Sequence, residues 1–302
     1  MSALVKSHPL GLPSLLGFSA GLMISVCLSQ PMPAASQLHV SFRAAPGGNS
    51  AHSIAVPVEG AGFLVAIVAN GADPHQPQLL LGQKKILAKV VGFDPISRLQ
   101  FLQMENETSL PLVAWLPGVN SHANAHLIAK TLTGPVPCRA MGWTKQVNGK
   151  VLPLALLKVA FDREVPLPGT PLVTNGGGIV AIIFQASDTG KIAYAIPAEA
   201  VHRVQRDICE GRPFVRGWLG LCLRAENKIP QIVRVLPDSP AAQAGTLPGD
   251  VLTSIGDRKI SDYADAANAF FYLIPDAPVQ VKLLRGTVSL EFTMTPSKPD
   301  GM

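Results

Sequence analysis

The stretch Arg216–Leu252, RGWLGLCLRAENKIPQIVRVLPDSPAAQAGTLPGDVL, decides how the last third of the chain folds. It contains three compact motifs, which are RGWLGL at 216–221, SPAAQAG at 239–245 and GDVL at 249–252. Gly217 and Gly220 let the backbone approach another chain closely, because glycine carries no Cβ. A short helix is expected over 240–244, where Gly245 closes it. Since apolar runs flank this helix, the stretch predicts strands that alternate with short helices.

Outward from these motifs, the whole segment 212–302 is predicted to be one compact α+β unit. The expected elements are strands over 215–223, 231–236 and 250–255, helices over 240–244 and 262–273, and a final hairpin over 279–284 and 289–295. Ser261 is the expected N-cap of the longer helix, and Pro275 ends it. Arg212-Pro213 is the expected linker to the preceding region.

The preceding segment, 37–211, consists of short apolar runs rich in Val, Ile and Leu, which Gly, Pro and Asn separate. The runs lie at 53–58, 62–69, 85–91, 99–104, 126–132, 151–161, 171–174 and 178–185. Strands of this length and spacing are typical of an all-β barrel or sandwich. A helix is expected over 199–210, because apolar residues recur there at helical spacing and Gly211 ends it.

The composition of the chain excludes several classes of protein. Its 302 residues are 47% hydrophobic and only 15% charged, which excludes an intrinsically disordered chain. The 27 glycines and 27 prolines argue against a long helical bundle. The net charge of +5 is spread thinly, with no basic cluster beyond Lys84-Lys85, so we predict no nucleic-acid partner.

Residues 1–36 have the pattern of a targeting segment. They hold no acidic residue, and after Lys6 and His8 an apolar run extends from Leu10 to Leu28. This pattern predicts a secretory signal peptide cleaved near Ala34-Ala35-Ser36 or Cys27-Leu28-Ser29. The alternatives are an uncleaved membrane anchor and lipidation at Cys27. We expect an exported protein, periplasmic or extracellular, that contacts a membrane only through this segment if it is not cleaved.

The cysteines and histidines do not form a recognisable metal motif. Cys27, Cys138, Cys209 and Cys222 have no C-x-x-C spacing, so neither a zinc site nor a redox motif is supported. Those that remain after cleavage are expected to be small buried side chains, with one disulfide as the alternative. His122 and His126 are four residues apart, but no acidic residue follows His122 as in helical zinc motifs. We predict no metal and no cofactor.

The three motifs of Arg216–Leu252 resemble those of a PDZ domain of the bacterial exported-protease type. In such a domain a peptide C-terminus enters a nest of backbone amides, and the peptide adds to a free sheet edge. The resemblance implies a nest around Trp218–Gly220, an edge at Leu219–Leu223 and a second wall at the helix over 262–273. The candidate peptide-binding residues are Gly217, Trp218, Leu219, Gly220, Leu221, Leu223, Ala266, Ala269 and Phe270. The alternative is that Trp218 and Leu221 are ordinary core residues.

The segment before this unit resembles the trypsin-like barrel of HtrA-type serine proteases. Val56–Val65 is similar to the first hairpin of the family, Ala88–Pro95 to its A-K-V-V-G-x-D-P motif, and Tyr194–Pro197 to its F-A-I-P motif. With the PDZ-like unit, the resemblance extends over residues 50–296. It implies a mostly β protein, with a trypsin-like double β-barrel over 37–211 followed by an α+β PDZ domain over 212–302.

The catalytic residues of that family are absent from the matching positions. The nucleophile segment P-G-N-S-G-G-P-L-V is matched by Pro168–Val173, PGTPLV, in which Thr170 is the only hydroxyl. Arg98 stands where the family has its catalytic acid, and Asp94 is a turn residue before Pro95. The histidine of the family has no counterpart near 69–73, and His75 lies in a turn. We therefore assign no catalytic residue.

Together these observations predict an exported HtrA-like pseudoprotease. Its PDZ domain is expected to bind C-terminal peptides or unfolded envelope proteins in a quality-control, scaffold or regulatory role. Homo- or hetero-oligomers with HtrA-type proteases are the expected assemblies. Two alternatives remain open at this point, which are an active serine endopeptidase with rearranged catalytic residues and a structural partner subunit of active proteases.

Overall fold

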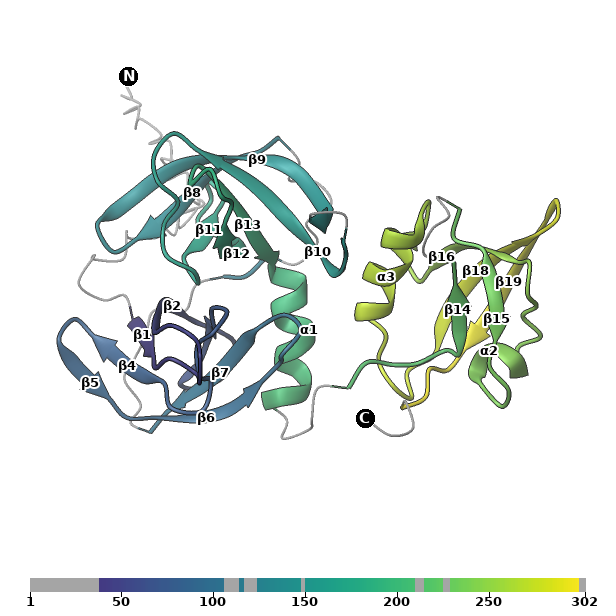
Figure 1. Ribbon diagram of the computed structural model, residues 1–302, viewed down its shortest axis with the longest axis horizontal. Coiled ribbons are helices and arrows are strands. Elements are labelled where there is room, and N and C mark those ends of the chain that lie inside the picture. Colours follow the sequence, from purple (N-terminus) through teal and green to yellow (C-terminus); the bar gives the residue numbers. More distant parts are fainter. Residues whose placement is uncertain are drawn as a thin grey trace, which may run out of the picture. The chain divides into compact units, whose positions relative to one another are not determined.

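The computed structural model describes residues 38–105, 114–116, 124–147, 150–209, 215–224 and 229–298, as shown in Figure 1. Residues 32–302 form one compact unit. Residues 1–36, with Cys27 and the expected cleavage sites, lie outside the described part, as does His122. None of the helices in the described part is long and apolar enough to cross a lipid bilayer.

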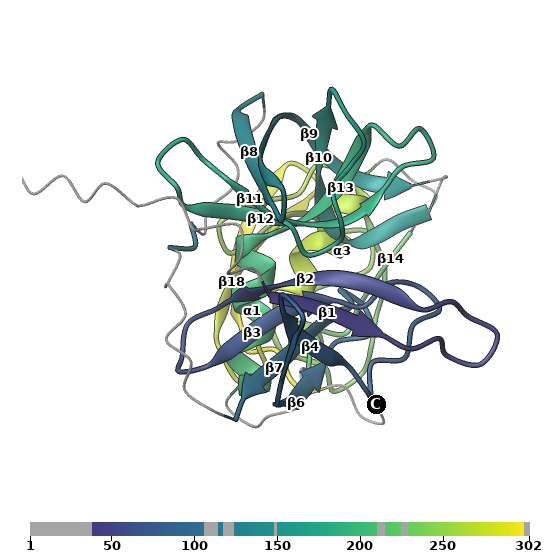
Figure 2. The same cartoon turned by 90° about the vertical axis from the view of Figure 1, so that its left-hand side faces the viewer.

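The first half of the barrel region is a seven-stranded antiparallel sheet with the strand order β5-β4-β1-β2-β3-β7-β6, as shown in Figure 2. Its strands are β1 (Leu38–Phe42), β2 (Ala51–Pro57), β3 (Phe63–Ile67), β4 (Gln78–Leu81), β5 (Lys84–Ile86), β6 (Ala88–Phe93) and β7 (Leu99–Met104). Leu38, Val40 and Phe42 of β1 are buried, and the residues between them are half-buried. Because side chains alternate along a strand, β1 turns one face toward a core.

The second half is a closed six-stranded barrel with the order β10-β13-β12-β11-β8-β9. Its strands are β8 (His126–Thr131), β9 (Gly134–Val147), β10 (Lys150–Phe161), β11 (Pro171–Val173), β12 (Ile179–Ala186) and β13 (Ile192–Pro197). Trp115 pairs in parallel with Ile179 of this barrel, and its indole Nε1–H donates to the Pro57 carbonyl at 2.9 Å. This residue therefore connects the two halves.

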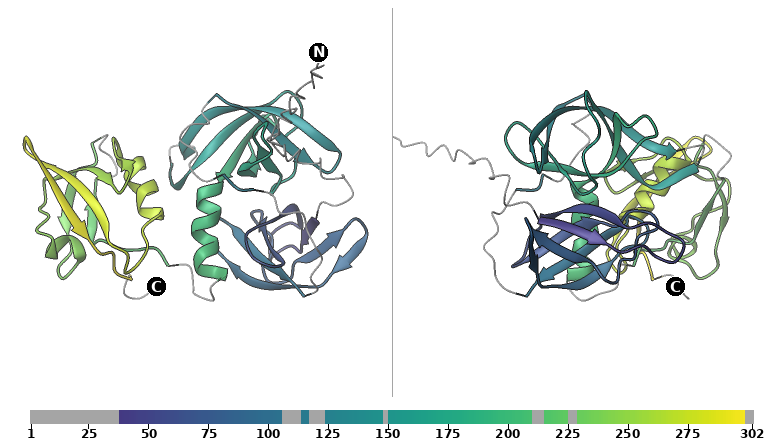
Figure 3. Two further views of the ribbon diagram at one scale, coloured as in Figure 1. Left: turned by 180° about the vertical axis from the view of Figure 1, so that it is seen from behind. Right: turned by 60° about the vertical axis from the view of Figure 1, so that its left-hand side comes forward.

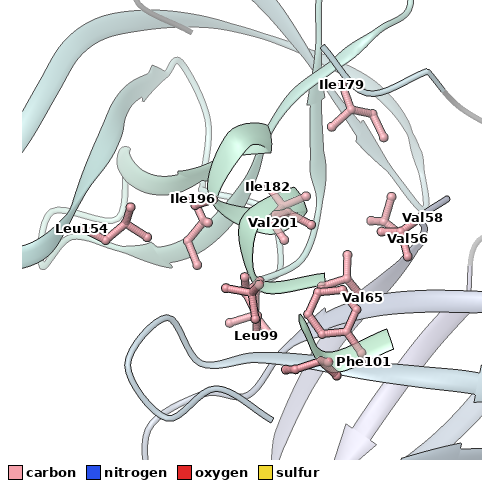
Figure 4. Close-up of a cluster of buried hydrophobic side chains, with 14 of the residues drawn as sticks. Val56, Val58, Val65, Leu99, Phe101, Leu154, Ile179, Ile182, Ile196 and Val201 are labelled. Carbon is pink, nitrogen blue, oxygen red and sulfur yellow. The ribbon is translucent and has the colours of Figure 1, made fainter. Parts of the chain in front are cut away.

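An apolar cluster fills the junction between the two halves, and Figure 4 shows part of it. The cluster combines Val65 and Phe101 from the first sheet with Ile182 and Ile196 from the barrel. Helix α1 (Ala198–Cys209) adds Val201 and three further apolar residues to it. The expected helix over 199–210 is confirmed within one residue at each end. Gly92 makes room for α1, since a Cβ there would lie 2.5 Å from Ile208 Cγ2.

The C-terminal region is an α+β unit with its own core. Its elements are β14 (Leu221–Leu223), β15 (Ile232–Val235), α2 (Pro240–Gln243), β16 (Val251–Ile255), β17 (Arg258–Lys259), α3 (Tyr263–Phe271), β18 (Val279–Arg285) and β19 (Val288–Met294). One sheet has the order β14-β15 and the other β17-β16-β18-β19. Helix α3 packs on this unit through Ala266 and Ala269, and Figure 3 shows it from two further sides.

Several local expectations need correction. The N-cap of α3 is Asp262 and not Ser261, because the Asp262 carboxylate accepts from the Asp265 amide at 2.7 Å. The strand expected over 215–223 is shorter, since only Leu221–Leu223 pairs as a strand. The apolar runs expected as strands did not include β1, β4, β9 or β13. Proline and glycine interrupt the apolar pattern of β9, and tertiary pairing with β8 and β10 on both sides holds this strand in place.

Two of the cysteines are free thiols. Cys138 is buried in the barrel and Cys222 is half-buried in β14. Burial raises the pKa of the Cys138 thiol to about 12, so this side chain is an unreactive part of the core. The side chain of Cys209 lies outside the described part. Because Cys138 and Cys222 are both free, the alternative of one disulfide among the three cysteines that remain after cleavage is wrong.

Asp250, in the GDVL motif, links the loop before β16 to the final hairpin. Its carboxylate is buried and accepts two hydrogen bonds from Arg285, both at 2.8 Å, and one from the Leu247 amide at 2.9 Å. The bonds from Arg285 hold the pKa of Asp250 below its usual value. The native state thus binds fewer protons at this carboxyl than the unfolded state does. Its stabilising effect is present above the unfolded pKa, near ~3.9, and disappears as the pH falls through the native value.

We predict that Asp250→Asn lowers the melting temperature at pH 7, and that the difference from wild type shrinks as the pH falls below ~4. The protonated carboxyl of the wild type then resembles the neutral amide. Thermal denaturation followed by circular dichroism from pH 3 to 8 measures this effect. Asp257→Asn, at an exposed turn position of the same unit, is the control. It should leave the melting temperature at pH 7 and its dependence on pH unchanged. If Asp250→Asn lowers the melting temperature by the same amount at every pH, the ionised carboxylate of Asp250 is not the source of the stabilisation.

Candidate functional site

A cavity of about 310 Å³ opens beside the loops at 69–70 and 165–168, which lie next to the segments expected to match the catalytic motifs of HtrA-type proteases. It is lined by Ala69, Asn70, Val165, Pro166, Leu167, Pro168, Phe184, Gln185 and Ala186. The only polar side chains in this lining are the amides of Asn70 and Gln185. Neither amide is a nucleophile or a general base at neutral pH. The cavity can therefore receive an apolar side chain, but its own lining supplies no group for hydrolysis.

The segment Pro168–Pro171 is held by backbone bonds where the family has its nucleophile. The Gly169 amide donates to the Ile183 carbonyl at 2.7 Å, and the Thr170 amide donates to the Leu167 carbonyl at 3.2 Å. Thr170 is 1% exposed, so its hydroxyl is not presented to the cavity. Gly169 has φ +81°, and a Cβ there would lie 2.0 Å from the Ile54 carbonyl oxygen. Glycine is thus required for this close approach.

Ser53 is the other hydroxyl near this segment, and it is also buried. Its Oγ donates to the Pro168 carbonyl at 3.1 Å and accepts from the Ile67 amide at 3.1 Å. The side chain is completely excluded from solvent. Ser53 therefore joins β2 and β3 to the loop of the second half, and a substrate does not reach it.

Arg98, at the position of the family's acid, binds the backbone of the neighbouring loop. Its Nε–H donates to the Val68 carbonyl and its Nη2–H to the Ala69 carbonyl, both at 2.5 Å. The residue adopts φ +57°, an unusual conformation for a side chain of this size. Burial lowers the pKa of its guanidinium. Arg98 thus fixes the loop that carries Ala69 and Asn70 of the cavity wall.

Asp94 and His75 also have local structural roles. Asp94 is buried, and its carboxylate accepts from the Ser97 amide at 3.0 Å and from the Ser97 hydroxyl at 2.5 Å, as expected of a turn residue. His75 is exposed, and its amide donates to the Asp73 carboxylate at 2.8 Å. Neither residue lines the cavity.

The second candidate site comprises β14 and α3, which the sequence analysis expects to form the two walls of a peptide groove. Within the described residues β14 pairs only with β15, so its other edge is available to a further strand. Leu221 and Leu223 of β14 and Phe270 of α3 are half-buried and pack against the same core cluster. The two elements therefore share one apolar core cluster.

The loop before β14 supplies amides at the end of this groove. The Trp218 amide donates to the Ser297 carbonyl at 2.8 Å, so it is not a free donor. Among the described residues, no backbone carbonyl accepts from the amides of Leu219 or Gly220. Gly220 has φ +80°, and a Cβ there would lie 2.1 Å from Ser239 Cβ. The close approach of the SPAAQAG helix thus requires glycine at this position and shapes the loop.

The sequence-predicted site residues do not all lie at the surface of the groove. Ala266 and Ala269 are 0% and 1% exposed and belong to the core of the unit. Leu219 is also buried, at 3%. Gly217 donates to the Leu273 carbonyl at 2.9 Å and has no space for a Cβ, which gives it a packing role.

Three stripes at helical spacing divide the surface of α3. Ala266, Ala269 and Leu273 face the core of the unit. Asp265, Asn268 and Tyr272 make contacts to the barrel region. The third stripe, at i, i+4 and i+7, consists of Tyr263, Ala267 and Phe270, which are all half-buried. The sequence analysis missed Tyr263 and Ala267. Their signal was the same 3.6-residue period that marks the core stripe.

The barrel-facing stripe of α3 joins the two regions through specific contacts. The Ala155 amide of β10 donates to Asn268 Oδ1 at 3.1 Å, and Lys145 of β9 forms an ion pair with Asp265. Phe271 is buried in the cluster at the barrel junction. Arg258 lies 3.5 Å from the centroid of the Tyr272 ring and pairs with Glu199 of α1.

The buried Arg203 and the half-buried Arg216 hold the segment that connects the two regions. Arg203 of α1 pairs with Asp207 at 2.7 Å and donates to the carbonyls of Val215 and Leu273 at 3.2 and 3.0 Å. Arg216 lies 4.8 Å from the centroid of the Phe271 ring and 3.7 Å from the Asp94 carboxylate. Through these contacts the two guanidinium groups connect carboxylates of the barrel region with carbonyl oxygens and an aromatic ring of the C-terminal region.

A trypsin-like double β-barrel followed by a PDZ domain is the class of protein that this architecture defines. Residues 217–295 match the PDZ domain family. A solved structure of the HtrA-type protease AlgW with a tripeptide is similar over 89% of this chain and 96% of that chain, with a TM-score of 0.64 and 23% identity. The serine endoprotease from Yersinia pestis is similar over 88% and 95%, with a TM-score of 0.55 and 21% identity. The expected fold class is confirmed.

Several curated proteins are similar to this chain in sequence. A "probable periplasmic serine endoprotease DegP-like" of Pseudomonas fulva is 25% identical over 80% of this chain and 56% of its own length. A "probable periplasmic serine protease do/HhoA-like" of Haemophilus influenzae is 26% identical over 66% of this chain and 47% of its own length. The chain spans about half the length of the curated relatives it matches.

We predict that Arg98→Asp destabilises the barrel by about 1–3 kcal/mol, because a carboxylate replaces two charge-assisted bonds at a half-exposed position and faces two carbonyl oxygens. Arg98→Lys should be intermediate, since lysine keeps the charge but not the fork of donors. Chemical denaturation measures both variants. Arg139→Asp, an exposed arginine of β9, is the matched control. Wild-type stability of Arg98→Asp would refute the loop-fixing role.

Proposed function

We propose that this protein is an exported, HtrA-like pseudoprotease whose PDZ domain binds the C-termini of peptides or envelope proteins. The barrel serves as a scaffold, and the role is quality control, scaffolding or regulation in the cell envelope. The chain contacts a membrane only through its N-terminal segment if that segment is not cleaved. Assembly with itself or with HtrA-type proteases is part of the same proposal.

The environment of Thr170 is the single observation on which the proposal of a non-catalytic barrel rests. This hydroxyl is buried, and Pro171 behind it has no N–H to stabilise an oxyanion. Arg98, which binds two carbonyl groups, cannot orient a histidine as a carboxylate does. The cavity beside these residues has no nucleophile in its lining. The apolar core remains intact without any of these groups, and a fold alone does not imply activity.

The groove supports the binding half of the proposal. The free edge of β14 supplies main-chain pairing, and the Leu219 and Gly220 amides supply donors for a terminal carboxylate. Leu221, Leu223 and Phe270 supply an apolar site for the terminal side chain. The similar protease AlgW is solved with a tripeptide and with a decapeptide, which supports the proposal of a peptide ligand.

A second candidate function is an active serine endopeptidase with rearranged catalytic residues. The names of the curated relatives favour it, since they describe serine proteases. A third is a structural partner subunit with a non-binding groove, and the extensive contacts of α3 with the barrel region favour it. The next two experiments separate these candidates.

We predict that the purified protein does not cleave unfolded casein above the buffer background and is not labelled by a fluorophosphonate probe. Arg98→Asp should restore no cleavage, because the nucleophile is still absent. Cleavage that survives Thr170→Ala would reveal another nucleophile, and cleavage abolished by Thr170→Ala would reveal a threonine mechanism. Either result would overturn the proposed pseudoprotease.

We predict that the full chain binds peptides with an apolar C-terminal residue at micromolar affinity, which corresponds to roughly −8 kcal/mol. Amidation of the peptide C-terminus should weaken binding about tenfold or more, because a charge-assisted hydrogen bond contributes about 1.5–3 kcal/mol. Gly220→Pro should also weaken it, since proline lacks the amide N–H. Isothermal titration of the acid and amide forms of one peptide measures the difference. Equal affinities would exclude the carboxylate nest and favour the structural subunit.

A further inference from the structure

The face of β14 that points away from the core carries a half-buried thiol with a cation above it. Leu221 and Leu223 pack against the core, so the side chain of Cys222 between them points to the opposite face. Arg234 is paired directly with Cys222 across β14 and β15. Its Nη2 lies 3.8 Å from Cys222 Sγ, and the side chain is exposed. A guanidinium group therefore lies over the middle of the strand that borders the groove.

The amides at the amino end of β14 fix the register of a bound peptide. A carboxylate at the Leu219 and Gly220 amides lies at the amino end of β14, so the peptide extends along the strand in the antiparallel direction. The last residue of the peptide then lies opposite Leu221, the penultimate residue opposite Cys222, and the third-last residue opposite Leu223. Residues directly opposite each other in a sheet share a face.

This register gives the three ligand positions different surroundings. The last and third-last side chains point toward α3, where the stripe of Tyr263, Ala267 and Phe270 carries no charged group. These two side chains are about 6.6 Å apart, because a strand rises ~3.3 Å per residue. The stripe is about 10 Å long at ~1.5 Å per residue, which is enough for both of them. The penultimate side chain points to the face that carries Cys222 and the Arg234 guanidinium.

We propose that the groove selects C-termini that end in the order apolar, acidic, apolar, with Arg234 as the residue that recognises the acidic side chain. This inference rests on the proposed binding of C-terminal peptides. Neighbouring strands lie about 4.8 Å apart, so the acidic group of the peptide is within reach of a guanidinium that already lies over β14. Arg224, exposed at the next position on the same face, adds a second positive charge.

The test compares labelled heptapeptides that end in Val-Asp-Val, Val-Asn-Val or Val-Lys-Val with free carboxylates, using fluorescence anisotropy on the full chain. The aspartate peptide should bind about two- to fivefold more tightly than the asparagine peptide, as is typical of an exposed ion pair, and the lysine peptide should bind most weakly. The preference should fall when the ionic strength rises from 0.05 to about 0.5 M, because salt screens exposed charges.

Arg234→Gln should remove the preference for aspartate while leaving the asparagine peptide bound as before. Arg234→Glu should reverse the order, so that the lysine peptide binds more tightly than the aspartate peptide. Arg139→Gln removes the same charge from an exposed position on β9 and should keep the preference. Equal melting temperatures of wild type and variants establish that the exposed substitutions leave the fold intact.

The outcomes separate this inference from the proposed function. Carboxylate-dependent binding without a preference for aspartate, or a preference that survives Arg234→Gln, overturns the role of Arg234 alone. If none of the three peptides binds, or if the amide forms bind equally well, both the proposed function and this inference are wrong.

Discussion

One apolar cluster holds the two halves of the barrel region, helix α1 and the end of α3 in place, and the other features depend on it. Its buried members come from seven strands of the barrel region, from α1 and from Phe271 of α3. Each large aliphatic or aromatic side chain buried in this way contributes about 1.5–3 kcal/mol. The positions of the cleft loops and of one wall of the peptide groove thus follow from the same packing.

Structural contacts hold the loops beside the cavity in place. Arg98, Ser53 and Gly169 make bonds or close contacts to backbone carbonyl groups, so these positions stabilise loops. In the proposed pseudoprotease, the loops keep their positions because backbone hydrogen bonds and arginine contacts hold them.

Helix α3 contacts three environments at once, since its period of 3.6 residues separates three stripes. One stripe packs in the PDZ core, one contacts β9, β10 and α1, and one is left for the groove. The wall that would touch a ligand is therefore a rigid element, fixed by buried side chains on its other sides. A preorganised wall reduces the entropy that peptide binding costs.

The sequence by itself determined the fold class, the order of the two regions and the motifs of the PDZ domain. Those features reside in local patterns, such as the glycines of RGWLGL, the capped helix of SPAAQAG and the alternating apolar runs. It also located the loop at Gly220, and it predicted that Arg98 and Thr170 replace catalytic residues of the family that the chain resembles. Strand β9 escaped prediction because its prolines and glycines contradict local propensity, and only pairing on both sides stabilises it.

Only the tertiary structure decided which side chains of α3 are buried in the core. Ala266 and Ala269 looked suitable in sequence for the groove, but packing turns them into the core, whereas Tyr263, Ala267 and Phe270 are half-buried. The bonds from Arg98 to Val68 and Ala69, and the position of Arg234 over Cys222, join residues that are distant along the chain or lie on different strands. The periodicity of the sequence determines which residues share one face of a helix or strand. Long-range packing determines which neighbours each face contacts.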